Sequence, residues 1–457
     1  MARDVIIIGG GVSGLSVAHD LMGCGFSVRV LERQKQTGGN AISERFDGFL
    51  MEHGPSTFGA STATAMVQIE ALGLGESAFD LGPNVKKRYL RHNGKLSGIS
   101  AHPLGFFLSD YLSLRGRLRM AMEGVQRRKT DDVEETIFGF AARRFGHEFA
   151  EKVFDPLAAG LFMGDARKLS IEAAFARLPE MERNHGSISR AILKAKRGSA
   201  PGRHLYSWKQ GVATVPMVLA RALGDRVTTG ICVTKIRKTA RGFTVHTDAG
   251  TQQAKAVVLA VQPHVAAQFL EGIDPVGAAA AGAISAPPIN VVFLGYRREQ
   301  VAHPLDGLGV LSTKDPSRII TGLQFPSTMY PGRAPDGHVA ISVYAGGVRN
   351  PELARISDAD LVGQVSAELA LMLGISGAPV VVRTRRWALG LPQYTLGHGG
   401  RRATLETTHE RHEGLFVAGN FLQGVSMSNC IESAQNTAQK VAEHLGIHAA
   451  QIVSKAI

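Results

Sequence analysis

The sequence predicts an α/β fold in which one parallel sheet is assembled from both ends of the chain. A β-branched run at residues 4–8 leads into a glycine-rich turn and then into a helix from about Ser13 to Gly23. A second strand, glycine turn and helix start lie between Gly414 and Ser433. Short apolar runs that precede such turns are typical of buried parallel strands. We therefore expect a discontinuous Rossmann-like domain that is interrupted by a helical domain and a β-rich domain.

Composition narrows the class of protein. The chain has 457 residues, of which 44% are hydrophobic, and this is enough for two or three domains with a large core. Its cysteines (Cys24, Cys232 and Cys430) are far apart and form no CxxC pair, which argues against a disulfide framework and fits a reducing compartment. We expect no signal peptide and no membrane-spanning helix, and hence a cytoplasmic protein. The net charge of +12 suits an anionic membrane surface or an anionic substrate, whereas no motif supports nucleic acid as a partner.

The glycine-rich turn after the first strand fits a dinucleotide. Gly9 permits the tight turn, Gly11 lets the backbone approach a pyrophosphate, and Gly14 lets the helix pack closely on the strand. The helix start at Val12 and Ser13 offers unpaired N–H groups and the positive end of the helix dipole to phosphate.

The next segment indicates which dinucleotide is bound. After the first helix, the segment "FSVRVLE" predicts another strand, which ends at Glu32. A carboxylate at this strand end can bind ribose hydroxyls. A second glycine pair, Gly38-Gly39, follows closely and resembles that of the flavoprotein amine-oxidase superfamily, in which the pair lies along the pyrophosphate and flavin. The resemblance implies FAD as the cofactor, with contacts from Asn40 and Arg33; Thr37 stands where the superfamily usually has an arginine.

The same resemblance accounts for the unit near the end of the chain. In these flavoproteins a strand ends in a Gly-Asn or Gly-Asp turn, here Gly419-Asn420, and the next helix points its N-terminus at the flavin ring. That positive helix end would stabilise the anionic reduced ring. The helix is expected to start near Ser426 and Met427, with the backbone from Val425 beside the ring. The superfamily contacts adenine through a strand residue, which is Val233 here; the alternative for the whole unit is an ordinary Rossmann-type turn.

The remaining elements follow in order. Helical periodicity with arginine-rich faces dominates from about residue 85 to 200, where β signals vanish. β character returns at residues 225–261 as a hairpin-rich excursion that ends in a buried strand. Strands then alternate with loops from about 285 to 390, with one helix near Asp358–Leu373. The predicted domains are the FAD-binding domain in three parts (1–84, 201–270 and 405–457), the helical substrate and membrane-associating domain (85–200), and the substrate-binding β-sheet domain (271–404).

Within the superfamily, the chain is most similar to the protoporphyrinogen oxidase family along nearly its whole length. The segments "KKRYLRHNGKL", "DPLAAGLFMGDARKLSIEAAFARLPEME" and "YSWKQGVATVPMVLARAL" carry much of this resemblance. It implies a flat, mostly apolar tetrapyrrole with carboxylate arms, protoporphyrinogen IX, as the substrate. It also implies removal of six electrons in three flavin cycles, with O2 as the acceptor and H2O2 as a product. The chemistry would belong largely to the cofactor, so we expect no catalytic side chain from the protein.

The resemblance implies a set of substrate contacts. Arg88 aligns with an arginine that binds a propionate, and a guanidinium suits bidentate recognition of a carboxylate. Leu311, Leu323 and Tyr344 match positions that sandwich the pyrrole rings. Gly160 matches a glycine whose carbonyl faces the pyrrole N–H groups. The alternatives are a surface cation for Arg88, β-core side chains for the three sandwiching residues, and a helix-bend glycine for Gly160.

Other patterns are left open by the sequence. Bulky apolar residues beside the basic residues Arg115, Arg117 and Arg119 suit a peripheral contact with the cytoplasmic membrane, or else a core-facing amphipathic helix. These apolar residues are Phe106, Phe107, Leu108, Tyr111 and Leu112. We expect His409 and His412 to lie in a surface loop and not to bind a metal, since no third ligand is indicated. We expect Cys430 to be a buried thiol and not a covalent link to the flavin. A homodimer is also considered.

Rival functions remain at this point. Coproporphyrinogen III, with four carboxylate arms instead of two, would be favoured by extra basic residues such as Lys86, Lys87 and Arg91 around Arg88. An amine oxidase or a carotenoid-type desaturase would share the fold, but the aromatic pair expected of an amine oxidase is not found in the sequence. A flavin-binding protein without catalytic activity is the rival from another class.

Overall fold

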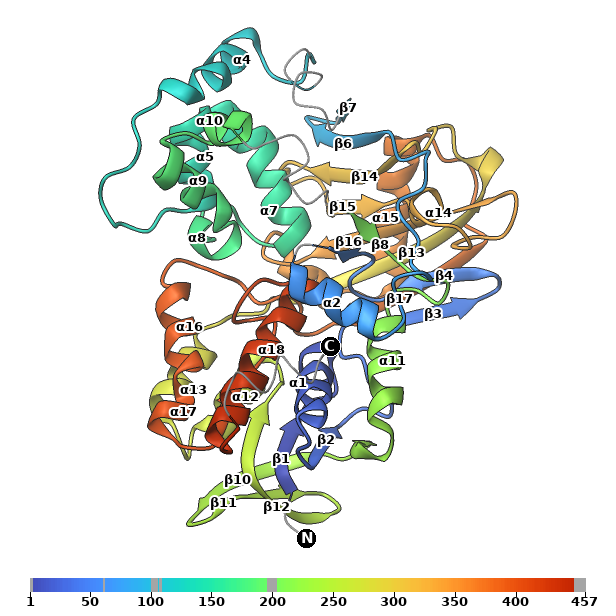
Figure 1. Ribbon diagram of the computed structural model, residues 1–457. Coiled ribbons are helices and arrows are strands. Elements are labelled where there is room, and N and C mark those ends of the chain that lie inside the picture. Colours follow the sequence, from blue (N-terminus) through green and yellow to red (C-terminus); the bar gives the residue numbers. More distant parts are fainter. Residues whose placement is uncertain (1–2, 61, 100–105, 107–108, 195–203, 448–457) are drawn as a thin grey trace.

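The computed structural model describes residues 3–60, 62–99, 106, 109–194 and 204–447. A first sheet and its helices form the lower body in Figure 1, and this body contains segments from both ends of the chain. A second sheet, with a layer of helices beside it, forms the upper body.

The first sheet joins strands that are far apart in the sequence. β1 (Arg3–Ile8) lies between β2 (Val28–Glu32) and β12 (Gly250–Leu259), and β18 (Leu415–Val417) pairs with the C-terminal part of β12. These four strands are parallel, so their carboxyl ends meet at one edge of the sheet, which is where open α/β sheets bind ligands. The sheet is completed by β9 (Val227–Thr229), β10 (Val233–Thr239) and β11 (Gly242–Thr247).

Helices cover both faces of the first sheet. One face shares a hydrophobic core with α1 (Val12–Gly23), α11 (Thr214–Leu223), α18 (Met427–His444) and α2 (Ala63–Ala71). The other face packs against α12 (Pro263–Leu270), α13 (Pro275–Gly282) and α16 (His398–Glu406). The short α17 (Thr408–Arg411) precedes β18. Because the ends of β1 and β12 are covered on both faces, residues 5–8 and 256–259 are continuously apolar and buried.

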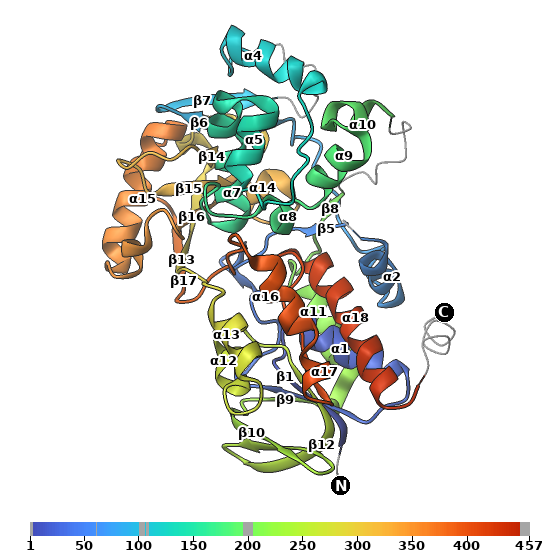
Figure 2. The ribbon, with the colours of Figure 1, turned by 90° about the vertical axis from the view of Figure 1, so that its left-hand side faces the viewer.

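The second sheet has the order β17-β13-β16-β15-β14-β6-β7, with antiparallel neighbours except for the parallel pair β14 and β6. One face packs against α15 (Asp358–Leu373), which lies on the outside of the sheet in Figure 2. We call this the α15 face, and the opposite face the α7 face. The strands are β6 (Lys87–His92), β7 (Lys95–Ile99), β13 (Ile289–Arg297), β14 (Gly307–Ser312), β15 (Ile320–Gln324), β16 (His338–Gly346) and β17 (Val381–Trp387).

The helical layer lies beside the ends of the second sheet's strands in Figure 1. Its central helix, α7 (Asp155–Phe162), follows a π-helical turn, η2 (Ala150–Phe154). A fully buried ion pair between Arg144 and Glu123 ties the layer together. The other helical elements are α4 (Leu114–Ala121), η1 (Met122–Val125), α5 (Ile137–Phe145), α6 (His147–Phe149), α8 (Ile171–Ala174), α9 (Arg177–His185) and α10 (Ile188–Lys194).

Short elements connect these parts. They are β3 (Ser43–Phe46), β4 (Phe49–Glu52), β5 (Phe58–Gly59), β8 (Leu205–Tyr206), α14 (Pro326–Met329), η3 (Gly224–Arg226), η4 (Arg298–Gln300) and η5 (Pro351–Ala354).

The predicted fold class is confirmed, and one regional expectation is wrong. The expected helix at Asp358–Leu373 is α15, and the expected strand that ends at Glu32 is β2. Residues 87–99, however, form β6 and β7 of the second sheet, where β signals were not expected. The strand signal was hidden because charged residues occupy half of β6, including the buried Arg91, which pairs with Glu368 of α15. Among the described residues, no helix combines the length and the apolar character needed to cross a membrane.

Candidate active site

The first glycine turn fits the close packing predicted for it. Gly9 has a φ of +108°, and a Cβ there would lie 2.3 Å from the carbonyl oxygen of Ala260. A Cβ on Gly14 would lie 2.0 Å from the carbonyl oxygen of Gly9, so only glycine lets α1 approach β1 this closely. Gly11 is the N-cap of α1 and supplies no capping side chain. The first-turn N–H groups, which include those of Val12 and Ser13, are therefore left for an external acceptor.

The second glycine pair lies directly against the first turn. The Gly38 N–H donates to the carbonyl of Gly10 at 2.8 Å, and Gly11 and Gly38 form a parallel bridge. A Cβ on Gly39 would lie 3.1 Å from the Cα of Gly11. The two glycine motifs, separated in sequence by β2, therefore form one cradle of bare backbone at the carboxyl end of β1, with Asn40 as the next residue.

Glu32 lies at the edge of this cradle. One oxygen of its carboxylate accepts from the N–H of Gly10 and the other from the N–H of Gln34, both at 2.7 Å. A carboxylate has about four lone-pair sites, so each oxygen can still accept from a ribose hydroxyl. The Glu32 carbonyl also accepts from Ile231 at 3.0 Å, which brings the start of β10, with Val233, near this carboxylate. Arg33 is exposed beyond the strand end.

The unit near the end of the chain reaches the same edge of the sheet. Gly419, with a φ of +150°, follows β18, which is parallel to β12 and β1. Ser426 caps α18, because its hydroxyl accepts from the N–H of Asn429 at 3.2 Å. α18 packs beside α1 in the same core, and both helices start at this edge. We call residues 419–426 the flavin turn; it carries Asn420 and Val425 and leads into Met427.

The start of α18 is packed into the first body. Met427 and Cys430 belong to its buried core, and Ser428 donates to the carbonyl of Gly59. Burial raises the pKa of the Cys430 thiol to about 11, while a hydrogen bond with Ser13 opposes that shift. As expected, Cys430 is a buried, protonated thiol.

Three predicted substrate residues, Arg88, Leu311 and Tyr344, share one face of the second sheet. Leu311 pairs with Leu90 and Gly322, and Gly322 also pairs with Tyr344. Paired residues of neighbouring strands share a face, and residues two apart in a strand do so too. Arg88, two residues before Leu90, therefore lies on the α7 face with Leu311 and Tyr344.

Gly160 of α7 packs directly on this face. A Cβ at Gly160 would lie 2.2 Å from the Cδ2 atom of Leu311, so α7 approaches the sheet through this glycine. The Tyr344 hydroxyl donates to the Oε1 atom of Gln324 at 2.9 Å. Burial raises the pKa of Tyr344, which also contacts Ser56, just beyond the β3–β4 hairpin.

The predicted position of Leu323 is wrong. Leu323 pairs with Val310 and Val343, and all three belong to the core against α15. It is 2% exposed and lies on the face opposite to Leu311 and Tyr344. Because side chains alternate along a strand, Leu323 cannot complete a sandwich with those two residues. Leu323 is instead a core side chain of the sheet, which is the alternative given above for this residue.

Sequence reasoning missed Leu157 and Leu161. They share one side of α7 with Gly160 at helical spacing, and 46% of Leu161 is exposed although the helix is otherwise mostly buried. An apolar side chain left bare beside the Gly160–Leu311 contact suits an apolar ligand. The sequence signal for these two leucines is their i, i+3, i+4 spacing with Gly160.

The histidines considered for a metal have other contacts. His409 stacks on Phe416 with ring centroids 5.2 Å apart, and His412 lies 3.6 Å from the buried Asp274. Within the described part of the chain, no cluster of three or more His, Cys, Asp or Glu side chains could hold a metal ion.

A cradle of bare backbone at the carboxyl ends of parallel strands, assembled from both ends of the chain, is the geometry of a dinucleotide-binding protein. A model of the flavin containing amine oxidoreductases matches residues 12–442. The chain therefore belongs to that family; it is an enzyme of this family, and FAD is its cofactor.

Comparisons with individual proteins agree. Protoporphyrinogen oxidase 1 of Spinacia oleracea is 30% identical over 97% of this chain and 84% of its own length. A coproporphyrinogen III oxidase of Bacillus subtilis is 25% identical over 95% of this chain and 96% of its own length. The crystal structure of a putative protoporphyrinogen oxidase from Exiguobacterium has the same fold, with a TM-score of 0.84, 21% identity, and coverage of 98% of this chain and 100% of that chain.

Proposed function

We propose that this chain oxidises protoporphyrinogen IX to protoporphyrin IX, with O2 as the electron acceptor and H2O2 as the second product. The observation that carries the proposal is the position of Arg88 on the same face as Leu311 and Tyr344, the face that α7 contacts through Gly160. A cation beside a row of apolar side chains suits a flat apolar macrocycle with a carboxylate arm. The named relatives support the same substrate class.

In this proposal the protein binds and orients, and the bound flavin supplies the redox chemistry. Arg88 holds a carboxylate arm of the substrate, while Leu311, Leu161 and Tyr344 exclude water from the ring faces. The cradle around Gly11 and Gly39 holds the pyrophosphate, and Glu32 holds the ribose. The start of α18 places the positive end of a helix dipole beside the flavin ring.

Coproporphyrinogen III is the second candidate substrate, because two of the relatives are named coproporphyrinogen III oxidases. It needs more cations for its additional carboxylate arms. Arg91 is 5% exposed and is paired with Glu368 on the α15 face, and Lys87 is paired with Asp306 at 2.9 Å. Lys87 and Arg91 are thus paired with acidic side chains of this chain, which weakens the case for a substrate with additional carboxylate arms.

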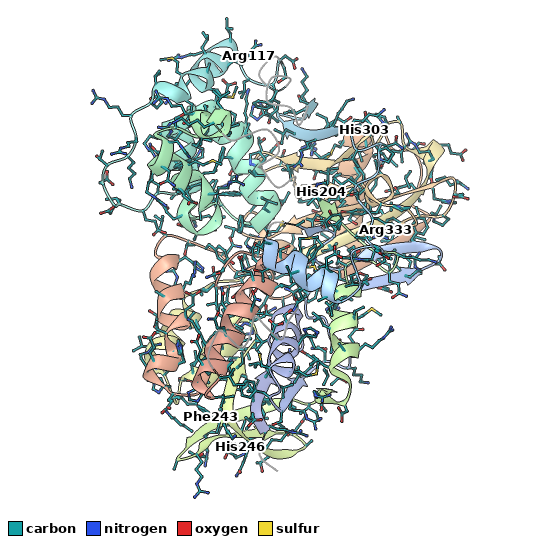
Figure 3. The ribbon with its side chains drawn as sticks, viewed as in Figure 1. Arg117, His204, Phe243, His246, His303 and Arg333 are labelled. Carbon is teal, nitrogen blue, oxygen red and sulfur yellow. The ribbon has the colours of Figure 1, made fainter. Side chains whose placement is uncertain are left out.

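We also propose a peripheral membrane contact, through apolar residues other than those first considered. Tyr111 and Leu112 are buried, Phe106 is partly buried, and Phe107 and Leu108 lie outside the described residues. The exposed apolar residues form a row along α4 and η1 instead, close to the exposed cations Arg115, Arg127 and Arg128. The α4 row consists of Leu114, Leu118, Met122 and Val125, each 52–71% exposed. It lies at the outer end of the helical layer, where Figure 3 labels Arg117.

The test of function is aerobic turnover of both porphyrinogens by the purified holoprotein, followed by porphyrin fluorescence and peroxide release. Faster turnover of protoporphyrinogen at equal concentration supports the proposal. Faster turnover of coproporphyrinogen would select the second candidate. If the porphyrin fluorescence of neither substrate rises faster with the protein than without it, the proposal is wrong.

Replacing Arg88 tests the proposed carboxylate anchor. We expect Arg88→Ala to raise KM by about 10-fold with a smaller effect on kcat, because an ion pair that forms on binding stabilises the bound substrate and the transition state alike. Lys95→Ala is the matched control, since Lys95 is an exposed cation of the neighbouring strand β7 that pairs with Asp110. An unchanged KM for Arg88→Ala would remove Arg88 from the site.

A further inference from the structure

Tyr394 is a fully buried tyrosine between the helical layer and the flavin turn. It is 0% exposed and belongs to the same core as Phe162 of α7, with Val425 of the flavin turn packed against that core. Its hydroxyl donates to the carbonyl of Asn420, inside the flavin turn. Burial raises the pKa of Tyr394 well above its ordinary value, so this hydroxyl is a permanent donor.

The other contacts of Tyr394 fix the ring on the opposite side. Its backbone carbonyl accepts from the N–H of Ser170 at 2.7 Å, at the start of α8. Its ring lies 5.8 Å from that of Phe162 and stacks on His398, with centroids 4.2 Å apart and planes 21° apart. His398 is 1% exposed and, like Tyr394, has no route to solvent.

The neighbouring Gln393 extends the same connection to α7. Its amide nitrogen donates to the carbonyl of Phe162 at 2.8 Å, at the C-terminal end of the helix that contacts Leu311 through Gly160. Adjacent residues of one segment therefore grip two elements, α7 through Gln393 and the flavin turn through Tyr394. α7 belongs to the proposed substrate region, and the flavin turn to the cofactor site.

We propose that Tyr394 is a positioning residue, which fixes the flavin turn against α7 and thereby sets where the flavin ring is held relative to the substrate. This rests on the proposed function only for the identity of the substrate. The turn needs such a tie because Gly419 is conformationally permissive, and the segment between β18 and α18 has no regular secondary structure of its own. Without the hydroxyl, the half-buried carbonyl of Asn420 would lose its donor, which carries a free-energy cost.

The test compares Tyr394→Phe with Tyr111→Phe in the full-length protein. Each change removes one buried hydroxyl that donates to a backbone carbonyl; the Tyr111 hydroxyl donates to Lys152 at 2.8 Å, far from the flavin turn. We expect Tyr394→Phe to weaken FAD binding by about 10-fold, as expected for one half-buried acceptor left without its donor, and to shift the midpoint potential of the bound flavin. Tyr111→Phe should lower Tm without changing either quantity. Equal FAD affinity and potential in wild type and Tyr394→Phe, or equal losses in both variants, would overturn the proposal.

A second pair of variants keeps the test informative if Tyr394→Phe does not fold. His398→Ala removes the ring that stacks on Tyr394 and should also weaken FAD binding, whereas His398→Phe restores a stacking ring and should recover it. Loss in both variants, or in neither, would contradict the positioning role. FAD binding is measured without substrate, so this proposal can fail while the oxidase function stands. A wild-type chain that binds FAD but oxidises neither porphyrinogen would remove the function alone.

Discussion

At the scale of single residues, Gly14 shows how the cofactor cradle depends on the absence of a side chain. A Cβ at this position would meet backbone atoms of Gly9 and the side chain of Ala260. Neither can move without separating α1 from β1, and the start of α1 would move with it.

Gly14→Ala should therefore abolish FAD binding or reduce it by more than about 10-fold, with a large drop in Tm. Gly23→Ala in the same helix is the control, because nothing lies within 4 Å of a Cβ there. That variant should be as stable as wild type or slightly more stable. FAD content and Tm measure both effects, and full FAD occupancy in Gly14→Ala would contradict the described packing.

Glu52 is a second residue whose environment makes a prediction. It is 3% exposed, and burial raises its pKa from the ordinary 4.5 to about 7, against opposing contributions from Ser43, Arg333 and the N–H of Val212. Between pH 4.5 and 7 the folded protein keeps a proton that the unfolded chain releases. The contribution of Glu52 to stability is therefore complete below about pH 4.5 and is lost as pH rises through about 7, at a cost on the order of 3 kcal/mol.

Glu52→Gln removes this titration, so its Tm relative to wild type should rise by a few degrees from pH 4.5 to 7.5. Glu70→Gln, at an exposed position of α2, is the control and should show a constant difference from wild type. A Glu52→Gln difference that does not change with pH would mean that folding does not raise the pKa of Glu52.

At the scale of elements, hydrophobic periodicity could predict helices and strands, but it could not predict on which face of a sheet a given side chain lies. The alternation in β15 reads equally well with Leu323 toward either side, and only the pairing with Val310 and Val343 places it against α15. The strand β6 was missed because Arg91 reverses the usual rule that charges point outward, which requires Glu368 from a distant helix. The glycine turns, in contrast, were predictable because their spacing alone determines which backbone can approach a phosphate.

The prediction at the scale of elements concerns membrane binding by the α4 row. We expect the wild-type protein to bind vesicles that contain anionic phospholipid, and Leu118→Glu to reduce that binding by about 10-fold, because a carboxylate opposes both apolar insertion and attraction to the anionic surface. Leu371→Glu is the control, since Leu371 is 78% exposed on α15, outside the α4 row. Equal vesicle binding by the two variants would exclude the α4 row as the membrane contact.

At the scale of the whole molecule, segments that are far apart in sequence meet at one edge of the first sheet, where we propose that they hold the cofactor. Both glycine turns and the flavin turn meet at one edge of the first sheet, while the elements between them build the second sheet and the helical layer (Figures 1 and 2). Sequence could predict that both ends serve one site, because each carries its own motif. It could not predict the tie through Tyr394, which depends on a contact between α7, the segment before α16, and the flavin turn.

The measurement that tests the central claim most directly is anaerobic mixing of the purified holoprotein with protoporphyrinogen IX, followed by the visible absorbance of the bound flavin. The account predicts that the absorbance of the oxidised flavin bleaches on mixing, and that it returns on admission of air together with release of H2O2. A flavin that stays oxidised in the presence of protoporphyrinogen IX would contradict the account.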